Sequence, residues 1–223
     1  MAATKTGRPS AGQQRRTRRS GLLWAALAAV VAAVIAAVVL VNLNTHSAAP
    51  TGAGKTAAGY AVGNPGPGAQ APAFSIPSTT GGTVNLSDYR GKTVLLYFHE
   101  GLGCQPCWDQ IRDLDAAKTQ LHSAGIDQVL TITSGPVNLI AQKMTDDKLT
   151  ATALADTKLD VSRTYGANQF GMMGDSRDGH SFILVGPDGR IQWRADYGGA
   201  PDYTMYVPVA KILTDLQAGR TGK

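Results

Sequence analysis

Between residue 73 and about residue 219 the sequence predicts an α/β sandwich, with a central mixed sheet and helices on both faces. Three short apolar runs, at residues 93–98, 129–133 and 181–185, have the length and composition of strands. The first and third are almost continuously apolar, which indicates burial on both faces of the sheet. Segments with helical periodicity alternate with these runs, and such alternation is typical of layered α/β domains.

Helices are expected between and after the predicted strands. A helix after the first strand has an apolar face at spacings of three and four, formed by Ile111, Leu114, Ala117 and Leu121. Pro136 suits the first turn of a second helix, and Pro208 that of a closing helix. The closing helix has an apolar face of its own, formed by Val209, Ile212, Leu213 and Leu216. A Gly-Pro-Asp-Gly turn at 186–189 returns the chain as a hairpin strand at 190–194.

The N-terminal part of the chain has the pattern of a membrane anchor. Residues 1–20 contain six basic residues and no acidic one, and Leu22–Val41 is a run of 20 residues without a polar side chain. A helix of that length crosses about 30 Å of hydrocarbon, so we expect a single transmembrane helix at 21–43. Because positive charge stays on the cytoplasmic side, residues 1–20 are expected to form a cytoplasmic tail. The domain from residue 73 is then expected on the extracytoplasmic side of the cytoplasmic membrane.

The net charge also separates this anchor from the predicted domain. The formal charge of the chain is +5, yet the tail alone contributes +6, and the part from residue 73 onward has 14 basic and 16 acidic residues. The basic character therefore indicates membrane topology, and a nucleic-acid partner is not expected. Residues 44–72 are rich in Ala, Gly and Pro without apolar periodicity, so they are expected to form a flexible tether.

The chain has two cysteines, Cys104 and Cys107, separated by Gln105 and Pro106. They lie between a predicted strand and an amphipathic helix, where a Cys-X-X-Cys pair performs redox chemistry. If Cys104 begins the helix, the free amides and dipole of the first turn stabilise its thiolate. We therefore expect an exposed, reactive Cys104 and a shielded Cys107 that resolves the mixed disulfide. Pro106 fits the first helical turn, where its missing amide proton is not needed.

Two other interpretations of the cysteine pair fit the sequence less well. A zinc site needs about four ligands, and the sequence has no second cysteine pair to complete one. A purely structural disulfide that closes so short a loop would restrict the unfolded chain very little. Redox activity is therefore the preferred interpretation, with no cofactor expected.

The domain resembles the thioredoxin-fold redoxin group, which includes the alkyl hydroperoxide reductase/thiol-specific antioxidant family and membrane-anchored thiol-disulfide oxidoreductases. Four stretches carry the resemblance in the same order: Ala71–Phe74 (APAF), Val84–Lys92 (VNLSDYRGK), Cys104–Cys107 (CQPC) and Phe182–Trp193 (FILVGPDGRIQW). The resemblance implies a thioredoxin-like sandwich and catalytic roles for Cys104 and Cys107.

Three positions depart from the patterns of this group. Peroxidases of the group have a Pro and a Thr or Ser before the reactive cysteine, whereas Tyr97–Gly103 reads YFHEGLG. Thioredoxins have a buried carboxylate before the cysteine pair, which acts as a proton acceptor. Tyr97 occupies that position in this sequence, so Glu100 is the candidate for the proton acceptor. The cis-proline that faces the cysteines in thioredoxins is replaced by His180, while His99 is expected to be a packed residue at the end of the strand.

The sequence favours a membrane-anchored, extracytoplasmic thiol-disulfide oxidoreductase that acts on protein thiols, protein disulfides or small oxidants. Its catalytic residues are Cys104 and Cys107, supported by Gln105, Pro106, Glu100 and His180. Two alternatives stay open. One is a copper-binding protein similar to the SCO group, since two thiolates and an imidazole, here Cys104, Cys107 and His180, suit Cu(I). The other is a peroxidase similar to peroxiredoxins.

Overall fold

The computed structural model describes residues 29, 31 and 55–221. The predicted cytoplasmic tail, almost all of the predicted transmembrane helix and the first part of the predicted tether lie outside the described residues. Among the residues that are described, no helix has both the length and the apolar character needed to span a membrane. The residues from 55 onward belong to one compact unit, which begins near residue 53.

A mixed five-stranded sheet forms the centre of this unit, as predicted. Its order is β5 (Thr152–Ala155), β4 (Gln128–Thr133), β3 (Val94–Phe98), β6 (Ser181–Val185) and β7 (Ile191–Asp196). Strands β3, β4 and β5 run parallel, whereas β6 pairs antiparallel with both β3 and β7. The register places Phe98 opposite Ser181, so the residues that follow β3 lie beside the residues that precede β6.

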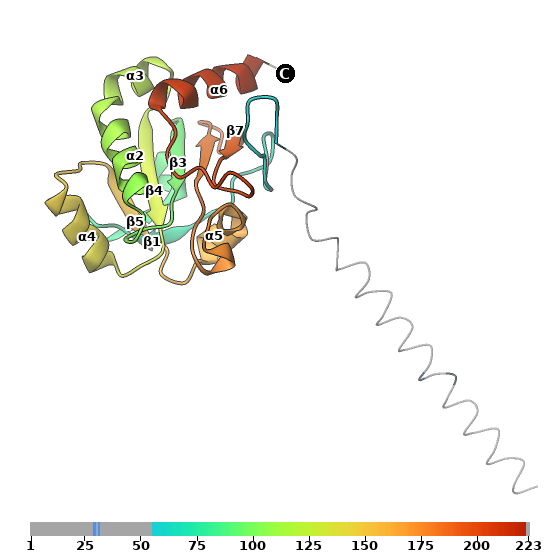
Figure 1. Ribbon diagram of the computed structural model, residues 1–223, viewed down its shortest axis with the longest axis horizontal. Coiled ribbons are helices and arrows are strands. Elements are labelled where there is room, and N and C mark those ends of the chain that lie inside the picture. The colour runs from blue at the N-terminus through green and yellow to red at the C-terminus, as the bar shows by residue number, and fades with distance from the viewer. Residues whose placement is uncertain (1–28, 30, 32–54, 222–223) are drawn as a thin grey trace, which may run out of the picture. The chain divides into compact units, whose positions relative to one another are not determined.

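One face of the sheet is covered by four helices, α2 (Gln105–Ala116), α3 (Lys118–Ser123), α4 (Val137–Asp146) and α6 (Val209–Thr221). Leu95 and Tyr97 of β3 point to this face together with Phe182 of β6. Figure 1 shows α2 continuing into α3, with α4 and α6 at other parts of the sheet. The predicted helix over Ile111–Leu121 is thus two helices, which meet at Ala117.

The opposite face is covered by the short helix α5 (Asp160–Thr164) and by a hairpin of β1 (Ser75–Pro77) and β2 (Thr83–Asn85). Leu96 and Phe98 point to this side. Three 3-10 turns complete the described part of the chain, at Leu86–Tyr89, Ala167–Gln169 and Gly174–Ser176. With helices on both faces, the architecture is the predicted thioredoxin-like sandwich.

The segment 55–72 differs from the prediction of a flexible tether, because it packs on the domain. Tyr60 is 6% exposed and its ring meets Trp193 edge-on. Ala61 forms a bridge with Asp196 of β7, and the Gly63 amide donates to the Asp196 carboxylate at 2.7 Å. The domain therefore begins before residue 73. Composition did not reveal this, because one aromatic ring and hydrogen bonds between the segment's backbone and the domain hold the segment without any apolar periodicity.

Candidate active site

The two cysteines lie at the start of α2, where the sequence places them. Cys104 is the N-cap residue of the helix, Pro106 lies in its first turn, and the cysteines form a disulfide with Cα atoms 5.3 Å apart. The loop before them turns at Gly101, whose φ of +87° favours glycine. Its carbonyl accepts a hydrogen bond from the indole nitrogen of Trp108 at 3.1 Å, which ties the loop to α2.

The exposure of Cys104 corrects the prediction. We expected an exposed Cys104 and a shielded Cys107, but the two residues are 6% and 0% exposed. Met205 packs in one buried cluster with the cysteine pair. It belongs to the segment 197–208 between β7 and α6, which is held against α2 because the Val207 amide donates to Gln110 Oε1 at 2.7 Å. Gln105 and Pro106 are exposed, so they form the surface of the first turn.

Removing this cover is expected to make the disulfide easier to reach. A Met205→Ala variant should be reduced faster by a small thiol, because attack on a disulfide depends on access to its sulfur. We also expect a loss of about 2 kcal/mol in the free energy of unfolding, the low end for truncating a buried Met. Timed thiol labelling and a urea titration measure the two effects. An unchanged reduction rate would show that Met205 does not control access.

A cluster of aromatic and imidazole rings lies on the helix-covered face, at the end of the sheet where α2 begins. The Tyr97 ring stacks between His99, with centroids 5.2 Å apart, and Phe182, at 4.6 Å. The Tyr97 hydroxyl lies 3.0 Å from Nδ1 of His180. His99 in turn meets Trp108, the neighbour of Cys107, edge-on at 5.5 Å. The cluster therefore connects both histidines to the first turn of α2.

Both imidazoles are neutral at ordinary pH. Each is 0% exposed, and burial lowers the pKa of both His99 and His180 to about 3; the nearby His99 contributes to the shift of His180. Within residues 55–221, neither ring nitrogen of His99 has a hydrogen-bond partner, nor has Nε2 of His180. Such unpaired buried polar atoms are rare and call for an explanation. The prediction that His99 is packed at the strand end agrees with its burial.

The copper alternative gains no support from this geometry. Across the described part of the chain, no three His, Cys, Asp or Glu side chains are placed to hold a metal ion. Cys104 and Cys107 are joined to each other, and His180 uses Nδ1 toward Tyr97. The structure thus does not bring Cys104, Cys107 and His180 together as a ligand set.

Glu100, the candidate proton acceptor, is buried, and its carboxylate contacts the loop before β6. Its Oε1 accepts the amide proton of Met172 at 2.5 Å, so this oxygen is directed at the loop before β6. Its carbonyl accepts a hydrogen bond from Arg177 at 3.2 Å. The Arg177 guanidinium comes within 4.0 Å of the position that a Cβ would take at Gly103. Arg177, which the sequence analysis overlooked, therefore places a positive charge beside the start of α2.

A pair of buried carboxylates fixes the loop before β6, which carries Met172 and Arg177. The Ser162 hydroxyl lies within hydrogen-bond distance of both Asp156, at 2.7 Å, and Asp178. Asp178 also accepts the Ser134 amide at 2.6 Å. The Ser162 hydroxyl can donate its proton to only one of the two carboxylates. A proton on Asp178 therefore supplies the second hydrogen bond. Consistent with this, burial raises the pKa of Asp178 to about 8, with Asp156 adding to the shift.

This raised pKa predicts a pH-dependent stability. The folded protein keeps a proton on Asp178 up to about pH 8, whereas the unfolded chain loses it near the ordinary value of 3.8. The stabilisation that protonated Asp178 provides is complete below that ordinary pKa. Above it the free energy of unfolding falls as pH rises, by up to about 1.4 kcal/mol per pH unit, until the folded protein also loses the proton. Asp178→Asn should remove this slope. Urea titrations of both proteins at several pH values measure it; equal slopes would contradict the assignment.

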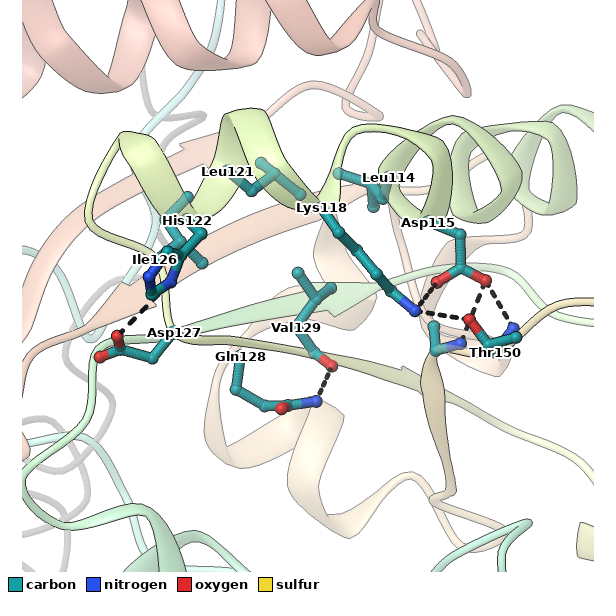
Figure 2. A pocket seen from close by; sticks show the side chains of 11 residues that line it. Leu114, Asp115, Lys118, Leu121, His122, Ile126, Asp127, Gln128, Val129 and Thr150 are labelled. Atoms are coloured by element: carbon teal, nitrogen blue, oxygen red, sulfur yellow. Dashed lines mark hydrogen bonds and ion pairs between the residues drawn. The ribbon is translucent and has the colours of Figure 1, made fainter.

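Another pocket lies away from the cysteines, at the other end of α2. It measures about 430 Å³ and is lined by parts of α2, α3 and β4. Figure 2 shows that polar groups of its lining pair with one another: Lys118 with Asp115 and Thr150, and His122 with Asp127. No cysteine lines this pocket.

Comparisons with known proteins agree with the fold. Residues 67–194 match the AhpC/TSA family, which is more than half of the chain. A putative peroxiredoxin of Mycobacterium tuberculosis is 31% identical over 128 residues, 56% of this chain and 81% of that protein. Peroxiredoxin Bcp of Escherichia coli K12 is 32% identical over 125 residues, 55% of this chain and 80% of that protein.

Solved structures support the fold. The crystal structure of peroxidoxin BcpB from Mycobacterium tuberculosis has a TM-score of 0.57 at 17% identity, covering 69% of this chain and 97% of that one. A putative thiol:disulfide interchange protein DsbE from Chlorobium tepidum has a TM-score of 0.52 at 22% identity, with the same coverage of both chains. A thioredoxin-like sandwich, a cysteine pair at a helix N-terminus and these family matches lead to one conclusion: the chain belongs to the AhpC/TSA family of thioredoxin-fold oxidoreductases.

Proposed function

We propose that the protein is a thiol-dependent peroxidase, similar to peroxiredoxins, in which a hydroperoxide oxidises Cys104 and Cys107 resolves the product. The observation that carries the proposal is the disulfide between Cys104 and Cys107 at the N-terminus of α2. The names of the relatives, peroxiredoxin and putative peroxiredoxin, favour peroxidase activity over the thiol-disulfide exchange that the sequence alone suggested.

The reaction cycle balances with two cysteines and external thiols. The Cys104 thiolate attacks the terminal oxygen of the hydroperoxide; the O–O bond breaks, the alcohol or water leaves, and Cys104 becomes a sulfenic acid. The Cys107 thiol then attacks this sulfur, which releases water and forms the Cys104–Cys107 disulfide. Two thiols of an external reductant return the pair to the dithiol form and become a disulfide themselves.

Two features of the site favour a thiolate at Cys104. It caps α2, a helix of 12 residues, so its sulfur belongs to the end of the helix where the dipole is positive. The guanidinium of Arg177 adds a full positive charge beside Gly103, the preceding residue. Because only 6% of Cys104 is exposed, a small hydroperoxide suits the site better than a folded protein as the first reactant.

Steady-state kinetics test this proposal. The full-length protein, supplied with a dithiol reductant, should consume hydrogen peroxide or an alkyl hydroperoxide catalytically and much faster than an equal concentration of a free thiol. Cys104→Ser should reduce the rate to that of the reductant alone. A rate for the unmodified protein no higher than that of the free thiol would exclude peroxidase activity.

Thiol-disulfide exchange is the second candidate function, and one observation favours it. The segment before the cysteines, Tyr97–Gly103, has neither the Pro nor the Thr or Ser expected before a peroxidatic cysteine. In this case Cys107→Ser should accumulate mixed disulfides between Cys104 and other proteins in cells. Absence of such adducts, together with peroxidase turnover, would reject the second candidate.

We further propose that residues 21–43 anchor the protein in the cytoplasmic membrane with the redox domain outside. The support is the apolar run Leu22–Val41 and the basic residues before it. Protease added to spheroplasts should then digest the domain but spare residues 1–20. Protection of the whole chain from the protease would reverse the proposed topology.

A further inference from the structure

The exposed apolar side chains of the domain are unevenly distributed over its surface. Within residues 55–221, the large apolar or aromatic side chains that are 36–54% exposed are Leu102, Leu139, Met172, Met173, Tyr203 and Tyr206. All of them belong to segments at one end of the central sheet. A contiguous apolar patch on a protein surface marks a site that binds another protein or a membrane.

The sheet topology explains why these segments meet. Strands β3, β4 and β7 run in one direction, because β4 is parallel to β3 while β3 and β7 are both antiparallel to β6. The segments that follow these three strands, and the segment that precedes β6, therefore share one end of the sheet. Leu102 follows β3, Leu139 follows β4, both tyrosines follow β7, and the two methionines precede β6. Cys104 also follows β3, so this end is named the cysteine end.

Contacts between the segments make the exposed residues neighbours. The Met172 amide donates to Glu100 Oε1 at 2.5 Å, which ties the methionine loop to the loop that carries Leu102. A Cβ at Gly135, in the turn before α4, would lie 3.9 Å from Cδ1 of Leu102. The loops after β3 and β4 and the loop before β6 therefore form one continuous surface.

The segment 197–208 extends this surface, and the start of the domain lies beside it. A Cβ at Gly199 would lie 3.1 Å from the ring of Phe170, which immediately precedes the methionine loop. Lys55, where the continuously described part of the chain begins, forms an ion pair with Asp202. The domain is thus connected to the preceding part of the chain at its cysteine end.

The opposite end of the sheet has a charged surface instead. The turns there, before β3 and between β6 and β7, expose Arg90, Lys92, Asp188 and Arg190. Among residues 55–221, no large apolar side chain is exposed in these turns. The apolar surface is therefore specific to the cysteine end.

The length of the chain before Lys55 indicates what covers this surface. The proposed anchor ends at residue 43, so residues 44–54, eleven in all, separate it from Lys55. Even when fully extended, a segment of this length spans at most about 40 Å. Covalent connection alone therefore keeps the cysteine end close to the surface of the anchoring membrane. Tyrosine, which has an apolar ring and a polar tip, suits the boundary between lipid and water.

We propose that the cysteine end docks on the lipid bilayer that anchors the chain, with Leu102, Met172, Met173 and Tyr203 in contact with lipid. The inference rests on the proposed membrane anchor and adds to it an orientation of the redox domain. Docking turns the cysteine pair toward the membrane, so a reactant held at the bilayer surface has a short path to Cys104.

Site-specific photocrosslinking tests this proposal. The full-length protein is reconstituted in phosphatidylcholine vesicles with the photoreactive residue p-benzoylphenylalanine at Met173 or, in a second variant, at Tyr203. The matched control has it at His122, whose side chain is 76% exposed on α3, away from the cysteine end. Burial of one large apolar side chain favours the docked state roughly tenfold or more, so we expect roughly tenfold more lipid adduct at Met173 and Tyr203 than at His122.

The distribution of the adducts decides the matter. An excess of lipid adducts at Met173 and Tyr203 supports the proposal. Lipid yields at these positions no higher than at His122, or adducts between two copies of the chain in place of lipid adducts, would overturn it. The vesicles contain no other protein, so a surface built for a protein partner also gives no excess of lipid adducts.

Flotation of the vesicles separates failure of the anchor from failure of the docking. Protein that does not float with the vesicles rejects the anchor and the docking together, whereas floating protein without excess adducts rejects the docking alone. The three substituted side chains are exposed, so each variant should keep its fold. These measurements need no peroxidase turnover and remain decisive if the proposed activity is absent.

Discussion

A Cys104→Ser variant is expected to lose all hydroperoxide reduction while it keeps its fold. The serine hydroxyl is a far weaker nucleophile than a thiolate, and no other cysteine at a helix N-terminus replaces it, since the chain has only Cys104 and Cys107. Cys104 makes no side-chain cap hydrogen bond to α2, so the substitution removes no structural contact of that kind. Peroxide consumption coupled to a dithiol reductant measures the loss.

Cys107→Ser provides the matched control for this prediction. Without added reductant it should still react once with hydroperoxide at Cys104, but it should stop at the sulfenic acid and form no disulfide within the chain, because the resolving thiol is absent. Turnover that survives in Cys104→Ser and disappears in Cys107→Ser would mean that the two roles are reversed.

An Asp196→Ala variant is expected to be the least stable single substitution considered, with a loss of about 3–5 kcal/mol in the free energy of unfolding. Arg194 and Asp196 are both 0% exposed and form a two-pronged ion pair at 2.8 and 3.0 Å. Removing the carboxylate leaves the guanidinium buried without its counter-charge. The same carboxylate holds the Gly63 amide, so the segment 55–72 should loosen as well.

Thermal and urea unfolding measure this loss, which corresponds to a Tm lower by roughly 10 °C. Asp202→Ala is the control, because Asp202 forms an ion pair with Lys55 at the surface, where its side chain is 60% exposed. An exposed pair of this kind contributes less than about 1 kcal/mol. If the two variants were equally stable, the buried pair would not hold the N-terminal segment in place.

The sequence predicted the parts of the fold that rest on apolar repetition. The runs at β3, β4 and β6 are buried in the sheet, and the helical faces of α2 and α6 pack on it as expected. Strand β5 was missed because Thr-Ala-Leu-Ala has too little apolar contrast to stand out. Helix α5 was missed because five residues give no periodicity to detect, although Asp156 fixes it through the Ser162 amide at 2.8 Å.

The site was predictable where chemistry depends on neighbours in the sequence. The spacing of Cys104 and Cys107 before an amphipathic helix placed the pair correctly at the start of α2. The burial of Cys104 was not predictable, because Met205, which packs in one cluster with the cysteine pair, comes from a segment distant in the sequence. In the sequence, Tyr97 stands only as a replacement for the buried carboxylate of thioredoxins. In the structure, the sheet register brings it beside His180, and no local sequence pattern predicts such a pairing.

One measurement tests the central claim, that Cys104 and Cys107 reduce hydroperoxide as a pair. The fully reduced protein is mixed with one equivalent of hydrogen peroxide, and its mass and thiol content are followed over time. We predict that the peroxide is consumed faster than by a free thiol, that both thiols disappear together, and that the protein loses two hydrogen atoms as the disulfide forms. Peroxide left unconsumed beside a protein that still has two thiols would contradict the account.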